Sequence, residues 1–293
     1  LHKEYRRQRQ MCIRDSDHLV IAVSDLPRAI ADYTALGFTV LEGGRHPGRP
    51  THNALVVFED GSYLELIAWH SPGLDDDRWW QWLKGHGEGL VDVALHPDDV
   101  ARVVARAQAG DVALGGPYDG GRARPDGEIL QWQTARHITP DLPFLCGDIT
   151  PRHLRVQEGE VRRHANGVTG VASVTLVVED LNRTLARYRI LLGEEAVWSA
   201  PWRLATTGLQ VAQLRLPAHP GAESGATLIL IEPDRGSTAE SARALSTLLR
   251  QRGEGVLAFT LRGARSRDQF PWPGGSVPVS YTHLRAHETL RYL

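Results

Sequence analysis

The chain has 293 residues, of which 42% are hydrophobic and 23% are charged, and its formal net charge is −2. This length accommodates two domains, and the composition is that of a globular protein that buries a hydrophobic core. No run of about 20 uncharged apolar residues is present, which argues against a membrane-spanning helix. No apolar signal segment opens the chain, so we expect a cytoplasmic protein without a membrane partner.

The two ends of the chain differ in character from the rest. Residues 1–16 and 280–293 resemble translated sequencing-adapter read-through, a contaminant of assembled metagenomic reads, and we set both apart as artefactual tails. Without their seven Lys/Arg and three Asp/Glu residues, 26 basic and 32 acidic residues remain, a net charge of −6. Nucleic-acid binding requires a basic face, so this balance argues against such a partner. Cys146 is then the one remaining cysteine, which fits a reducing compartment.

A first module is predicted over residues 17–72. An apolar strand leads into a helix at residues 26–36, where apolar side chains recur at helical spacing until Gly37. Runs rich in β-branched and aromatic residues predict three further strands. These strands are expected at residues 38–42, 52–58 and 62–69. The order is therefore βαβββ.

The same order returns over residues 88–150. A strand at 88–95 and a helix at 98–109 precede three candidate strands. These candidate strands are residues 118–124, 128–136 and 143–148. A short helix between the modules, at residues 75–85, carries three tryptophans that we expect to pack it against the sheets.

A longer internal repeat has an offset of 155 residues. The pattern that starts at Asp25-Leu26 and includes Tyr33 recurs from Asp180-Leu181 to Tyr188. We therefore predict a first domain at 17–150 and a second at 168–279. The second contains a full module, 168–233, and a truncated one, 254–279. The fold class is α+β, built from tandem βαβββ modules.

This arrangement resembles the vicinal oxygen chelate superfamily, the glyoxalase and extradiol dioxygenase group. Within it, residues 44–53, GRHPGRPTHN, are similar to the GRHPGxxTHN loop of an uncharacterised glyoxalase-like family. The resemblance covers residues 17 to about 262. It implies that two modules pair into a cupped mixed sheet, and that the cup holds a divalent metal, either Fe, Mn, Ni or Zn.

The resemblance also implies that metal ligands come from the first and fourth strands of each module. His18 and Glu65 occupy those positions in the first module. In the second module Leu90 aligns with His18, and the position of Glu65 falls at or next to Cys146. A catalytic metal needs about three protein ligands, so we expect a third from His52 or Asp92. His18 and Glu65 as a buried hydrogen-bonded pair without metal remains the alternative.

Further residues are candidates for binding substrate. Trp132 is expected on the inward face of its strand, because Gln131 and Gln133 alternate to the other face. Cys146 is expected as a small buried hydrophobe or, if it faces the cup, a soft ligand or nucleophile. The remaining substrate-binding candidates are Arg45, Arg49 and Asn53, of which the arginines suit a carboxylate-bearing substrate. Other loop histidines, His46 among them, are expected in solvent.

Two functions remain open. The first is a metal-dependent lyase, isomerase or dioxygenase acting on a small substrate with vicinal oxygens, with Glu65 and His52 as catalytic candidates. The second is a metal-free protein that binds small molecules, like the antibiotic-sequestering members of the superfamily. In both, the partner is a small molecule and the protein is a monomer or a homodimer.

Overall fold

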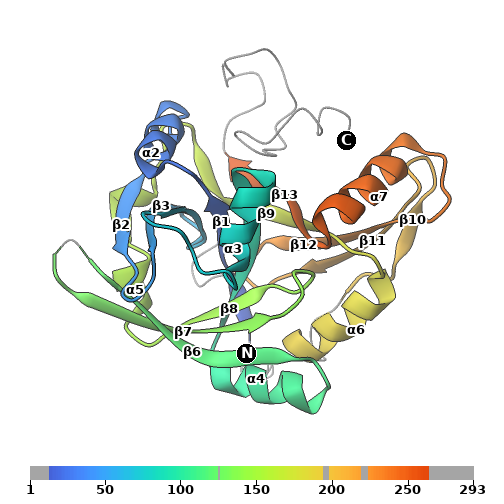
Figure 1. Ribbon diagram of the computed structural model, residues 1–293, viewed down its shortest axis with the longest axis horizontal. Coiled ribbons are helices and arrows are strands. Elements are labelled where there is room, and N and C mark those ends of the chain that lie inside the picture. The colour runs from blue at the N-terminus through green and yellow to red at the C-terminus, as the bar shows by residue number, and fades with distance from the viewer. Residues whose placement is uncertain (1–12, 125, 194–197, 219–223, 264–293) are drawn as a thin grey trace.

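The computed structural model describes residues 13–263 except 125, 194–197 and 219–223, and these residues form two mixed sheets that lie side by side (Figure 1). The predicted tail at 280–293 and residues 264–279 of the last predicted module lie outside the described residues. The first sheet contains β1 (Ile13–Ala22), β2 (Leu41–Arg45), β3 (Thr51–Val57), β4 (Tyr63–Trp69), β5 (Gly89–Pro97), β6 (Leu114–Ala123), β7 (Ile129–His137) and β8 (Phe144–Asp148). The second contains β9 (Val168–Val177), β10 (Trp202–Leu204), β11 (Leu209–Arg215), β12 (Thr227–Pro233) and β13 (Gly255–Gly263).

The order of strands in the first sheet is β2-β3-β4-β1-β5-β8-β7-β6, and in the second it is β10-β11-β12-β9-β13. In the first sheet, β1 pairs parallel with β4 and β5 pairs parallel with β8, while β1 and β5 pair antiparallel at the centre. Each half of this sheet is therefore one βαβββ module, and β9 to β12 repeat the order. The α+β fold of tandem modules is confirmed.

The helices follow the first strand of each module or connect modules. They are α2 (Leu26–Ala35), α3 (Arg78–His86), α4 (Val100–Ala109), α5 (Arg152–Arg155), α6 (Leu181–Leu192) and α7 (Glu240–Arg252), with a short 3₁₀ helix, η1, at Gly159–Arg162. Aspartate caps recur: the side chains of Asp25, Asp99 and Asp180 each accept a hydrogen bond from the backbone three residues later. Within the described residues, none of the helices has the length and apolar character of a membrane span.

The first sheet curls, so that its outer strands β2 and β6 approach each other. Gly44 marks this seam, because a Cβ there would lie 2.5 Å from the carbonyl oxygen of Ala123. The concave face, which we call the cup, carries a cluster that includes Val20, Ile67 and Phe144. The opposite face packs against helices and the second sheet in the main hydrophobic core.

In the first module, two predicted boundaries differ from the structure by more than one residue, and in the second the strand predicted at 118–124 is Leu114–Ala123. β1 starts at Ile13, inside the segment set apart as a tail, because residues 13–16 pair with the end of β5 and Ile13 is buried. β2 runs over Leu41–Arg45 rather than 38–42. Phe38 instead packs its ring against Tyr33 and Phe58, and the Gly43-Gly44 pair continues the strand through an irregularity.

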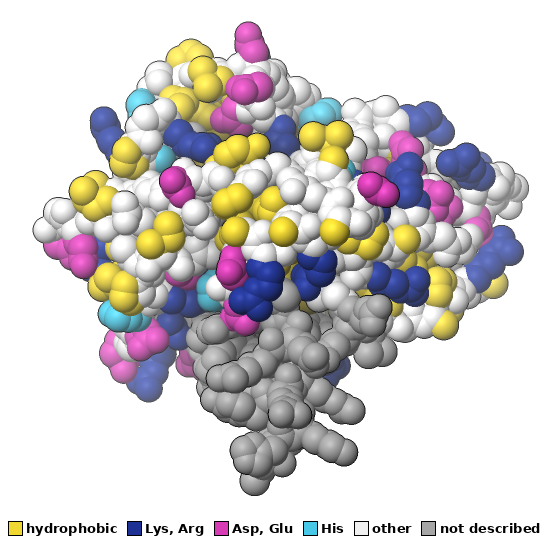
Figure 2. Space-filling model, turned by 90° about the horizontal axis from the view of Figure 1, so that it is seen from below, with side chains coloured by type: hydrophobic (Ala, Val, Ile, Leu, Met, Phe, Trp, Pro, Cys, Tyr) yellow, Lys and Arg dark blue, Asp and Glu magenta, His cyan; other side chains and the backbone are white. Residues whose placement is uncertain are grey.

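The surface carries both signs of charge. On the face shown in Figure 2, acidic and basic side chains of the described residues are interspersed among apolar ones. On that face, no large area of the described residues carries charge of only one sign.

Candidate functional site in the cup

His18 lies in β1 and is held from two sides. Its Nδ1 is 2.7 Å from the Asp17 carboxylate and its Nε2 is 3.4 Å from Oε2 of Glu65. The imidazole stacks on the Tyr63 ring with centroids 4.5 Å apart, and the residue is 4% exposed. A carboxylate on Nδ1 fixes the orientation of the ring, so Nε2 faces Glu65 across the cup.

A β-bulge explains why two neighbouring residues, Asp17 and His18, interact by their side chains. The pairing of β1 with β5 shifts between Ser16 and His18, so that Asp17 has no partner in the register. An extra residue in a strand re-aims the side chains beside it. Here the bulge brings the Asp17 carboxylate behind the His18 ring instead of on the opposite face.

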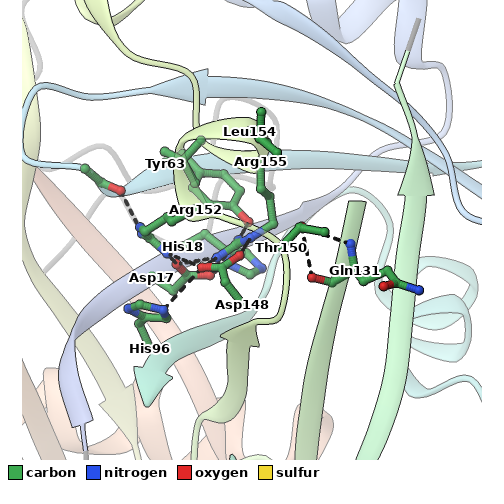
Figure 3. A network of polar contacts seen from close by, with 12 residues as sticks. Asp17, His18, Tyr63, His96, Gln131, Asp148, Thr150, Arg152, Leu154 and Arg155 are labelled. Carbon is green, nitrogen blue, oxygen red and sulfur yellow. Dashed lines mark hydrogen bonds and ion pairs between the residues drawn. The ribbon is translucent and has the colours of Figure 1, made fainter. Parts of the chain in front are cut away.

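Asp17 is fully buried and belongs to a network of charges (Figure 3). Arg155 donates to it at 2.9 Å and 3.1 Å, and Arg152 makes a further ion pair with it. Burial alone would raise the pKa of Asp17, but the charges of both arginines and the His18 hydrogen bond hold it well below its usual value. Asp148 completes the network by pairing with Arg155 at 2.5 Å. The carboxylate behind His18 is therefore permanently ionised.

Glu65 stands in the middle of β4 and is 8% exposed. Its Oε1 accepts a hydrogen bond of 2.6 Å from the Asn53 amide. Burial would raise its pKa, but the hydrogen bond and charge of His18, with help from His46 and Asn53, lower it to about 2. Burial would conversely lower the pKa of His18, and the two carboxylates raise it. In the protein without metal, these shifts favour an imidazolium beside a carboxylate.

His46 is a member of the site that sequence reasoning placed in solvent. Its side chain is 10% exposed, and its Nε2 lies 3.9 Å from Oε1 of Glu65. Nδ1 lies 2.8 Å from the Thr51 hydroxyl, which ties the loop after β2 back to β3. Burial lowers the pKa of His46, so this imidazole is neutral at neutral pH. Its place in the GRHPGRPTHN segment, two residues beyond the seam glycine Gly44, is the signal that could have found it.

Arg122 was also missed. It is 4% exposed, lies in β6, and donates across the seam to the side-chain amide oxygen of Asn53, Oδ1, at 3.5 Å. Gly43 leaves room for this crossing, because a Cβ there would lie 2.5 Å from Nη1 of Arg122. A strand-to-strand contact over 69 residues leaves no local pattern in the sequence.

The structure does not bring His52 to the site. In β3, Leu55 is opposite Glu65 whereas His52 is opposite Ala68, so His52 points to the other face of the sheet. Its ring lies 6.1 Å from that of His70. Arg45 is opposite His52 in the register of β2 and is exposed, and Arg49 is exposed in the loop. Of the substrate-binding candidates in this region, Asn53 alone lies in the cup.

Asp92 rather than Leu90 is the counterpart of His18 in the second module. His18 lies seven residues before the helix cap Asp25, and Asp92 lies seven before the cap Asp99. The Asp92 carboxylate is already bound, because the indole of Trp79 donates to it at 2.9 Å and the Arg78 guanidinium forms an ion pair with it. Helix α3 thus neutralises the second module's ligand position.

Phe144, rather than Cys146, is the counterpart of Glu65. Val20 pairs with Glu65 in the first module, and the equivalent Ala94 pairs with Phe144 in the second. The Phe144 ring lies 5.3 Å from that of His18, edge to face. Cys146 is 3% exposed, and burial raises the pKa of its thiol, so it packs as a small hydrophobic residue.

Trp132 lies in β7 on the cup face, with its ring 6.2 Å from that of His46. It packs against the cluster that includes Phe144 and Cys146.

A separate apolar pocket, between α2 and β13, is lined in part by Tyr33 and Phe259 and contains none of the cup's polar groups.

The side chains in the cup fit a divalent metal in kind. His18, His46 and Glu65 offer two imidazoles and one carboxylate, a set used by non-haem iron and related sites, and Asp17 supplies the outer carboxylate typical of a ligating histidine. Within the described part of the chain, however, no three His, Cys, Asp or Glu side chains are already arranged around one point as a metal shell. The structure therefore presents a preformed pair, His18 and Glu65, with a third donor beside it.

The paired βαβββ modules and the polar groups of the first and fourth strands define the class of protein: the fold is that of the vicinal oxygen chelate superfamily. The model of the glyoxalase-like domain family matches residues 16–192, more than half of the chain, and the chain belongs to that family. No curated protein matches the chain at a significant level.

Solved structures share the fold at low identity. A hypothetical protein from Staphylococcus aureus has a TM-score of 0.60 and 12% identity over 86% of this chain and 92% of its own. A mutant of 4-hydroxymandelate synthase from Streptomyces coelicolor has a TM-score of 0.57 and 16% identity over 86% of this chain and 71% of its own.

Proposed function

We propose that the chain is a metal-dependent enzyme whose cup binds a divalent ion, either Fe, Mn, Ni or Zn, and a small substrate with vicinal oxygens. The observation that carries the proposal is the Asp17-His18-Glu65 arrangement, in which one imidazole nitrogen is fixed by a carboxylate and the other faces a second carboxylate at 3.4 Å. His46 is the proposed third ligand in place of His52. A bound ion would polarise the substrate oxygens as a Lewis acid, which serves a lyase, an isomerase or a dioxygenase.

The protonation states of the pair make the proposal specific. Burial alone would lower the pKa of His18, but the hydrogen bonds and charges of Asp17 and Glu65 raise it above 6.5, which favours the protonated imidazole in the metal-free protein. A metal needs the neutral imidazole, so binding at Nε2 releases a proton. Glu65, with a pKa of about 2, is a ligand and a poor proton acceptor at neutral pH. The proposed role of Glu65 is therefore that of a negatively charged metal ligand rather than that of the general base.

Calorimetric titration of chelator-treated protein with each metal tests this function. We expect about one equivalent bound, with proton release that shows as a dependence of the binding heat on the buffer. His18→Ala and Glu65→Gln abolish binding, and His46→Ala weakens it roughly 10–100-fold. His52→Ala is the matched control, because this histidine lies on the opposite face. Absence of binding for all four metals, or equal loss in His52→Ala, would reject the proposal.

A metal-free binding protein is the second candidate, and a specific observation favours it. The two ligand positions of the second module offer no free donor, because Asp92 is bound by Arg78 and Trp79 and because Phe144 occupies the position that corresponds to Glu65. Aromatic side chains, Trp132 among them, line that half of the cup. This function predicts that Trp132→Ala weakens binding of a small ligand while the purified protein contains no metal.

A further inference from the structure

Arg136 is a cation of the cup that the proposed metal site does not use. It lies in β7 four residues beyond Trp132, so both side chains are on the same face of the strand. Its guanidinium carbon is 4.3 Å from the centre of the Trp79 ring and 5.2 Å from that of Phe144. The two rings hold the guanidinium by cation–π contact and leave its edge of N–H donors for another group.

The carboxylates near Arg136 are bound to other groups. Burial lowers its pKa, and the nearby charges that act on it are the carboxylates Asp92 and Asp77 and the guanidiniums of Arg78 and Arg49. Asp92 is bound by Arg78 and by the Trp79 indole. Asp77 caps α3. Among the described residues, therefore, Arg136 has ring contacts but no carboxylate within ion-pair distance. The two carboxylates and two guanidiniums near it balance each other, so the charge of Arg136 itself is left uncompensated.

Phe144 connects Arg136 with the proposed metal site. Its ring lies 5.2 Å from the Arg136 guanidinium carbon and 5.3 Å from the His18 ring. Phe144 itself is 2% exposed, because Arg136, Trp79 and His18 pack around its ring. A carboxylate bound at Arg136 would therefore be separated from the His18–Glu65 pair by one ring.

We propose that Arg136 binds the carboxylate of a small organic acid in the half of the cup that the second module forms. Guanidinium and carboxylate match in a two-point hydrogen bond, and a guanidinium already fixed on aromatic rings loses little freedom when it binds. This proposal names the substrate class for the function above and rests on that function only for the metal at the His18–Glu65 pair. It gives Arg136 the role that Arg45 and Arg49 were expected to play, and both of those are exposed.

Benzoate and benzamide, which have the same shape and differ in charge, provide the test. Each is titrated into chelator-treated protein, with tryptophan fluorescence or calorimetry as the readout. We expect benzoate to bind at least roughly tenfold more tightly than benzamide, the effect of a charge-assisted hydrogen bond. Arg136→Gln removes this preference and Arg136→Lys retains a smaller one. Arg45→Gln, on the other face of the sheet, leaves it unchanged.

Two results would overturn the proposal: equal affinity of the wild type for benzoate and benzamide, or a preference for benzoate that persists in folded Arg136→Gln. The wild-type comparison needs no variant, so it decides even if Arg136→Gln does not fold. Because metal is absent throughout, the outcome is independent of the metal titration. If the protein binds no metal but prefers benzoate, it is a protein that binds organic acids without metal. If it binds metal but does not prefer benzoate, the metal site stands and the substrate is not a carboxylic acid.

Discussion

At the scale of single residues, the ionisation of the side chains in the cup depends on one β-bulge. The bulge at Asp17 puts a buried, arginine-bound carboxylate behind His18, and Glu65 meets the other ring nitrogen. The two groups stabilise each other as ions in the absence of metal. Their mutual pKa shifts therefore make the stability of the metal-free protein depend on pH at both ends of the accessible range.

For Glu65, the folded pKa of about 2 lies below the ordinary value of 4.5. Its contribution to stability is present above pH 4.5 and is lost as the pH falls through about 2. We expect the stability difference between wild type and Glu65→Gln to shrink over this window, as measured by urea unfolding of metal-free protein. A difference that stays constant from pH 5 to about pH 2 would contradict the assigned ionisation.

For His18, the folded pKa lies above the ordinary value of 6.5. Its contribution is complete below 6.5 and is lost as the pH rises through the raised folded pKa. Wild type should therefore lose stability relative to His18→Gln as the pH rises from 6.5 into the alkaline range. Urea unfolding of metal-free protein measures this difference in stability. A stability advantage of wild type over His18→Gln that grows with rising pH would contradict the prediction.

At the scale of elements, helix α3 covers the second module's half of the cup. Asp77 caps the helix by accepting from the backbone of Trp79 at 3.1 Å, and it also accepts from the Trp69 indole at 3.0 Å. Of the helix's tryptophans, Trp79 alone is buried, while Trp80 and Trp82 are partly exposed. One side chain thus anchors the helix to the sheet and fills the space beside Phe144.

We expect Trp79→Ala to cost about 3–5 kcal/mol of unfolding free energy, because it removes a buried ring and leaves Asp92 with one donor fewer. Trp82→Ala, the matched control on the same helix, should cost about 1 kcal/mol. Urea unfolding measures both, and hydrogen exchange over residues 78–86 should rise in Trp79→Ala alone. Equal costs for the two substitutions would show that Trp79 does not anchor the helix.

At the scale of the whole molecule, buried polar contacts join the two sheets. Asp141, just before β8, is fully buried and accepts from Thr184 at 3.2 Å and from Arg187 at 2.5 Å, both in α6. Arg106 of α4 donates to the carbonyl oxygen of Ile190 at 3.0 Å. These contacts place α4 beside α6, as Figure 1 shows. Buried polar contacts therefore fasten the two repeats to each other.

Asp141→Ala should destabilise the protein by roughly 3 kcal/mol, since it leaves the Arg187 charge without its partner. Glu160→Ala provides a matched control, because the exposed Glu160–Arg163 pair has a side-chain exposure of 81% and 70% and should contribute less than about 1 kcal/mol. Denaturant unfolding followed by circular dichroism distinguishes them. A similar small cost for both would mean that the buried pair does not hold the sheets together.

The sequence by itself determined the order of elements, the repeat of the βαβββ module and two members of the site. Strand and helix periods are local, and the 155-residue offset makes the repeat visible without coordinates. His18 and Glu65 were identified through the resemblance to the superfamily, which implies ligands in the first and fourth strands of each module. Trp132 lies on the cup face because of the two-residue period of a strand.

Only the tertiary structure decided which side chains meet. The bulge at Asp17, the return of His46 over Glu65 and the outward direction of His52 depend on strand register, where a shift of one residue reverses the face of a side chain. Asp92 and Arg136 receive their partners from α3, a helix outside both modules. Such contacts join residues far apart in the chain, and no local period in the sequence records them.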